Sequence, residues 1–179
     1  CRLHQTRTQS IVGEGNLSAR TMLIAQAPGE VEDKQGCMFV GPSGKILNEL
    51  FSFAKINRSD IYITNLLKCM LPNCRKPKQD EIQLCSYFLD MEIEFINPEI
   101  LVPLGFYATN YIFEKYFFPR IAKSDFAEYV GKLFSVGKKQ IFPLTHPAAI
   151  IYNKSLLEPT KQSYRKLGEL IQDKYKNIQ

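Results

Sequence analysis

Short apolar runs alternate along the chain with segments whose apolar residues recur at helical spacing. The runs predict four strands, at about 21–26, 60–65, 100–104 and 140–144. The helically spaced segments predict helices at about 43–54, 79–97, 107–118 and 159–176. Because strands and helices alternate, the pattern favours a parallel sheet with helices on both faces, which is a three-layer α/β/α sandwich.

The length of 179 residues is that of one ordinary domain, so we expect a single domain over 1–179. Residues 1–10 contain no apolar block of a secretory signal, and no apolar run reaches the roughly 18 residues of a membrane span. We expect a monomeric cytoplasmic protein without membrane contact. The net charge of +5 is compatible with a polyanionic partner, but it fits a solvated Lys-rich surface equally well.

Polar side chains stand at the carboxyl ends of three predicted strands: Gln26, Asn65 and His146. In a parallel sheet these ends share one edge, where ligands bind, so we expect the three side chains to converge. The inference depends on the set. Taken alone, Asn65 fits a turn or cap equally well, and His146 before Pro147 fits a hydrogen-bonded loop histidine.

Two loops near this edge are further candidates. Gly41–Gly44 opens a predicted helix, where free backbone N–H groups favour one phosphate, although a simple N-cap at Ser43 explains it equally well. Glu32 lies in a predicted loop between Gly29 and Gly36, where its carboxylate could hold a water or simply belong to a solvated acidic turn. Phe39 fits the core, or a platform on which a ring stacks.

The five cysteines are an odd number in a chain with no export signal, which argues against a disulfide framework. A metal or cluster site, a chemical role and plain burial remain as alternatives. Pattern alone thus leads to an α/β domain that binds nucleic acid or phosphate.

Five stretches in order resemble the family 4 uracil-DNA glycosylases of bacteria and archaea. They are CRLH at 1–4 with VGEG at 12–15, AQAPG at 25–29 with Glu32-Asp33, FVGPSG at 39–44, ITNLLKC at 63–69 and THPAA at 145–149. The resemblance spans nearly the whole chain. It implies a four-stranded parallel sheet between helices and an enzyme of base-excision repair that cuts the N-glycosidic bond of uracil in DNA. It also implies a prokaryotic, nucleoid-associated protein.

The resemblance also implies roles for particular residues in a pocket that takes a flipped-out uracil. Phe39 would stack on the base, Asn65 would bind its N3/O4 edge and reject cytosine, and His146 would face O2 and stabilise the departing anion. Gln26 and Ala27 would line the pocket. For DNA, the resemblance implies a phosphate contact at Ser43 and Gly44, and the stretch 150–152 is a candidate wedge.

Family members hold a structural four-iron, four-sulfur cluster with four cysteines. Cys69 and Cys85 match the second pair of ligands, and Cys1 matches the second member of the first pair. The remaining ligand is expected three residues upstream, which implies a truncated start. The alternatives are that Cys74 substitutes or that no cluster forms.

The chain departs from the family pattern at two places. Gln26 stands where many members have Glu, so Glu32 becomes the remaining nearby carboxylate that would assist the attacking water. Cys37 and Met38 replace the usual polar residue and proline before Phe39. These departures keep a DNA-binding relative with little turnover as a rival. Further rivals are a nucleotide-binding α/β protein, which lacks its full fingerprint here, and a glycosylase for hypoxanthine or a mismatched base.

Overall fold

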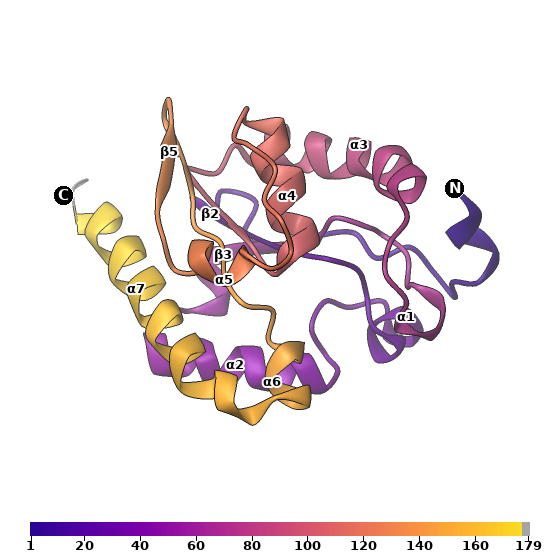
Figure 1. Cartoon of the computed structure of the whole chain (residues 1–179), viewed down its shortest axis with the longest axis horizontal. Helices are drawn as coiled ribbons and strands as arrows, with labels where there is room; N and C mark the ends of the chain where they lie inside the picture. The colour runs from indigo at the N-terminus through magenta and orange to yellow at the C-terminus, as the bar shows by residue number, and fades with distance from the viewer. Residues whose placement is uncertain (177–179) are drawn as a thin grey trace.

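A mixed sheet of six strands lies at the centre of the fold, in a computed structural model that describes residues 1–176 (Figure 1). Its order is β1-β3-β2-β4-β6-β5. The strands are β1 (Glu14–Gly15), β2 (Thr21–Ala25), β3 (Ile61–Asn65), β4 (Ile100–Pro103), β5 (Phe134–Val136) and β6 (Lys139–Ile141). The central strands β3, β2, β4 and β6 are mutually parallel, which confirms the predicted four-stranded parallel sheet.

The outer strands β1 and β5 pair antiparallel with β3 and β6 and were not predicted. They contain only two and three residues, too few for a recognisable alternation. They cover the two edges of the parallel sheet, whose open backbone groups would otherwise invite pairing with another chain.

Each long helix follows one of the predicted segments. The helices are α1 (Glu30–Gln35), α2 (Pro42–Ala54), α3 (Gln79–Ile96), α4 (Phe106–Lys115), α5 (Phe126–Tyr129), α6 (Ala148–Tyr152) and α7 (Leu157–Lys176), with 3-10 turns η1 (Arg2–Gln5), η2 (Arg58–Asp60), η3 (Pro72–Cys74) and η4 (Lys154–Leu156). The predicted domain continues to residue 179, and 177–179 lie outside the described residues. None of the helices within 1–176 is long and apolar enough to cross a membrane.

Two hydrophobic cores lie between the sheet and its helices, one on each face, and strand β2 contributes side chains to both. All five of its residues are buried, and alternate side chains point to opposite faces. Leu23 faces the core that α2 and α7 cover, whereas Met22 and Ile24 face the core of α3 and α4. Figure 1 shows the two helix pairs on opposite sides of the strands, so the molecule is the expected three-layer sandwich.

A third, smaller core joins the N-terminal turn to the loop after β3 and to α3. Its buried members are Leu3, Leu67, Cys69, Leu71 and Cys85. The N-terminal residues are therefore held against the part of the chain that carries two of the candidate cluster ligands.

Candidate functional site

A small pocket lies at the carboxyl ends of β2 and β3. It has a volume of about 20 Å³ and is lined by Ala27, Pro28, Gly29, Glu32, Met38, Phe39, Ser43, Asn65 and His146. The structure thus brings together six of the residues singled out in the sequence. Gln26 is half-buried beside the pocket, and neither Gln26 nor Gly44 is among the lining residues.

Phe39 forms one wall of the pocket in a strained backbone conformation. Its φ is +53°, which is rare for a residue with a side chain and clusters at functional sites. Gly44 permits this arrangement, because a Cβ atom there would lie 1.8 Å from the Phe39 carbonyl oxygen. The Phe39 ring stacks on His146, with 5.9 Å between ring centroids and 28° between planes.

Asn65 is the last residue of β3 and is 2% exposed. Its Nδ2 atom donates a hydrogen bond to the sulfur of Met38 over 3.1 Å. The amide therefore points into the pocket, where its one acceptor and two donors suit the edge of a heterocyclic base.

His146 follows β6 in the connection to α6. The backbone N–H of Ala148 donates to His146 Nδ1 over 3.1 Å, so in the neutral ring the proton sits on Nε2. Burial lowers the pKa of His146 to about 4. At neutral pH the ring is therefore an uncharged hydrogen-bond donor.

Glu32 reaches the pocket from α1 and is 6% exposed. Its Oε1 atom accepts a 2.7 Å hydrogen bond from the backbone N–H of Gly41, which fixes the loop leading into α2. Ser43 lines the pocket from the first turn of that helix. The backbone N–H of Gly44 is already bonded to the Gly41 carbonyl, over 2.9 Å.

A buried ion pair beneath Asn65 was missed in the sequence. Lys68 Nζ donates to Glu92 Oε2 (2.6 Å), to Thr64 Oγ1 (2.6 Å) and to the backbone carbonyl of Asn65 (2.9 Å). Lys68 and Glu92 side chains are 6% and 16% exposed. Burial lowers the pKa of Lys68, and the neighbouring Glu92 opposes that shift. The pair fixes the end of β3 at the residue that lines the pocket.

A second pocket, of about 430 Å³, brings together Cys1, Cys69 and Cys85. Arg7 Nη1 donates to the sulfur of Cys69 over 2.9 Å, and the backbone N–H of Lys68 donates to that of Cys85 over 3.2 Å. The other cysteines, Cys37 and Cys74, are exposed and lie outside this pocket. Within residues 1–176, no three His, Cys, Asp or Glu side chains are arranged to hold a metal ion.

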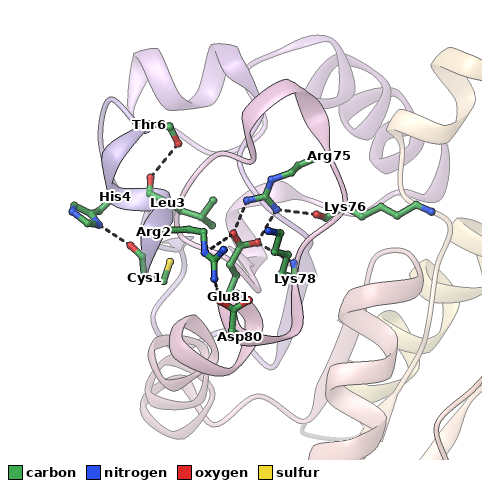
Figure 2. A network of polar contacts seen from close by, with 10 residues as sticks. All are labelled: Cys1, Arg2, Leu3, His4, Thr6, Arg75, Lys76, Lys78, Asp80 and Glu81. Atoms are coloured by element: carbon green, nitrogen blue, oxygen red, sulfur yellow. Dashed lines mark hydrogen bonds and ion pairs between the residues drawn. The ribbon is translucent and has the colours of Figure 1, made fainter.

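Figure 2 shows the polar network that attaches the N-terminal turn to α3. The buried Glu81 carboxylate accepts two hydrogen bonds from Arg75, at 2.8 and 2.5 Å, and one from the Lys78 backbone N–H at 2.9 Å. The hydrogen bond from Arg75 is the main reason why the pKa of Glu81 falls to about 2. Arg2 adds an ion pair to Asp80. Cys1 is thereby carried next to the helix that bears Cys85.

The comparisons with known proteins agree with this geometry. Residues 12–169 match the model of the uracil DNA glycosylase superfamily. The chain is 41% identical to the type-4 uracil-DNA glycosylase of Sulfurisphaera tokodaii, over 95% of this chain and 78% of the relative. It is 38% identical to that of Saccharolobus solfataricus (97% and 82%) and 37% identical to that of Archaeoglobus fulgidus (95% and 86%). On this evidence the chain belongs to the type-4 uracil-DNA glycosylases of the uracil-DNA glycosylase superfamily.

Proposed function

We infer that the protein is a uracil-DNA glycosylase of DNA repair, which hydrolyses the N-glycosidic bond of uracil and leaves an abasic site. The observation that carries this inference is the meeting of Asn65, Phe39 and His146 in one pocket of a chain from this family. Because the pocket is lined by buried side chains such as Asn65 and Phe39, the target base must leave the DNA stack to reach them.

Asn65 and Phe39 are proposed to recognise the flipped base. The Asn65 amide donates to uracil O4 and accepts from N3–H, and cytosine offers the opposite pattern at both atoms. Phe39 presents a ring on which a planar base stacks. The buried position of both residues makes a mismatched donor or acceptor costly.

His146 is proposed to stabilise the charge that develops on uracil O2 as the bond to the sugar breaks. A neutral ring with its proton on Nε2 provides a donor, and its partner at Nδ1 fixes the orientation in advance. A preorganised donor aimed at a growing negative charge is worth about 10²–10³ in rate. Uracil leaves with the bonding electron pair as its N1 anion, water adds to C1′ of the oxocarbenium-like sugar, and the proton that this water gives up passes to solvent.

Glu32 is proposed to assist that water, because it is the carboxylate of the pocket. Gln26 has no such role, and we propose that it shapes the pocket rim beside Ala27. On the DNA side, Ser43 and the first turn of α2 are proposed to contact a phosphate near the lesion, with Gly44 allowing close approach. The exposed Ile151 and Tyr152 at the end of α6 are the proposed wedge, whereas Ile150 of the predicted stretch 150–152 is buried in the core and cannot enter DNA.

We also propose that Cys1, Cys69 and Cys85 supply three ligands of a structural iron–sulfur cluster, although their side chains in the described structure are not arranged to hold a metal ion. The shared pocket and the N–H groups directed at two of the sulfur atoms support this, since such hydrogen bonds are typical of cluster sites. The cluster would cross-link the N-terminal turn to the β3–α3 connection. It takes no part in the steps at the base.

The cluster proposal predicts that the protein, reconstituted anaerobically with iron and sulfide, gains a broad visible absorbance from sulfur-to-iron charge transfer and binds iron. Cys69→Ser is expected to reduce the iron bound per chain and to lower the thermal midpoint. Cys37→Ser is the matched control, because its sulfur lies outside the pocket. Equal iron content in the two variants would contradict the assignment.

The functional proposal is tested by incubating a labelled oligonucleotide with one uracil, followed by alkali, which breaks the strand at abasic sites. Asn65→Asp is expected to lower uracil release by about 10- to 100-fold, because an ionised carboxylate has no donor for O4. Cytosine release is expected to rise above that of the wild type.

Asn97→Asp, at the exposed end of α3 where the acceptor for Lys139 is kept, controls for the added charge and is expected to retain wild-type activity. Tight binding of the oligonucleotide by the wild type without any strand breakage would instead favour a DNA-binding relative with little turnover. The glutamine at position 26, where many family members have a carboxylate, would fit that alternative.

A further inference from the structure

The Met38 side chain fills part of the pocket that is proposed to take the base. The pocket volume of about 20 Å³ is enough for one water, which needs about 10–15 Å³. Met38 is 1% exposed, lines this pocket and places its sulfur 3.1 Å from Asn65 Nδ2. One of the two N–H groups on the nitrogen that would donate to uracil O4 is therefore engaged by Met38, whose side chain also leaves too little free volume for a base.

The Met38 backbone is fixed from both sides. Its N–H donates to Glu14 Oε2 over 3.1 Å, and its carbonyl accepts from Arg58 Nη2 over 2.6 Å. Arg58 and Glu14 also bond to each other over 3.0 Å. The next residue, Phe39, is held in its positive-φ conformation against Gly44. The loop therefore has little freedom, whereas a methionine side chain has three rotatable bonds and adapts readily.

We propose that Met38 competes with uracil for the Asn65 amide, and that its side chain must rotate away before the base binds. This inference rests on the function proposed above and adds a residue that sets the affinity of its base pocket. A thioether is a weak acceptor, so uracil O4 displaces it at modest cost. The same exchange, run backwards, helps to expel the free base after the bond is cut.

The expected consequence is that Met38→Ala binds free uracil more tightly than wild type. Losing one weak competing hydrogen bond corresponds to about a two- to tenfold lower inhibition constant. The measurement is inhibition of oligonucleotide cleavage by added uracil, with KM for the oligonucleotide determined alongside. An unchanged or higher inhibition constant for Met38→Ala would overturn the proposal.

Met38→Leu separates the sulfur from the bulk, because leucine has a similar volume and no acceptor. If the sulfur competes, the leucine variant also binds uracil more tightly than wild type; wild-type affinity in Met38→Leu would show that bulk alone matters and would overturn the competition for Asn65. In an Asn65→Ala background, Met38→Leu should change the inhibition constant for uracil by less than it does with Asn65 present.

Failure of this inference is distinguishable from failure of the proposed function. If the wild type releases uracil and the Met38 variants have its inhibition constant for uracil, the inference alone is overturned. Wild-type protein that releases no uracil overturns the function on which the inference rests.

Discussion

His146→Ala is expected to lower the rate constant of uracil release by about 10²–10³-fold under single-turnover conditions. The side chain lies in the pocket with Asn65, and the Ala148 N–H group directs its protonated Nε2 away from the backbone. Alanine removes that donor and leaves the charge on uracil O2 without its nearest partner. Binding of uracil-containing DNA is expected to change much less than the rate, because the donor matters most when charge has developed.

The pH dependence provides an independent check on the state of His146. Because burial lowers its pKa to about 4, the ring stays neutral from pH 8 down to about pH 5. The wild-type rate constant is therefore expected to show no step near pH 6.5, the ordinary pKa of histidine. A rate that rises as the pH falls through 6.5, and that loses this rise in His146→Ala, would show that the charged ring acts instead.

The pattern of apolar residues was sufficient to predict the four parallel strands and the layers, but not the short edge strands β1 and β5. Strand β2 is buried on both faces and reads as an uninterrupted apolar run, whereas α2 and α7 show apolar residues on one face only. Since the central strands are parallel, their carboxyl ends share an edge, and the sequence alone therefore predicts that Asn65 and His146 lie together.

The pattern of apolar residues could not predict the side-chain contacts that complete the site. Met38 is an apolar residue in a loop, and nothing in its neighbours along the chain indicates that its sulfur meets Asn65. Lys68 and Glu92 are 24 residues apart, and each looks like an ordinary charged surface residue in a Lys-rich chain. Such pairs depend on how a loop crosses a helix, which local periodicity does not determine.

Lys68→Met is expected to lower the free energy of unfolding by about 3 kcal/mol, near the lower end of the cost of breaking a buried ion pair. Methionine keeps most of the side-chain volume but lacks the ammonium group that donates to Glu92, Thr64 and the Asn65 carbonyl. Glu92 retains 16% exposure and hydrogen bonds from the Gly13 N–H and the Thr64 hydroxyl, so water and these donors compensate in part. Urea unfolding with an unchanged m-value measures the difference.

Lys34→Met is the matched control, because Lys34 forms an ion pair with Glu30 on the surface of α1, with 66% and 73% of their side chains exposed. Exposed pairs contribute little, so its urea midpoint should stay at that of the wild type. A second comparison isolates the unpaired carboxylate: adding Glu92→Gln to Lys68→Met should recover part of the lost stability, because a neutral amide costs less to bury than an unpaired charge. Equal midpoints for Lys68→Met and Lys34→Met would mean that the pair beneath Asn65 is solvated in solution and does not hold the end of β3.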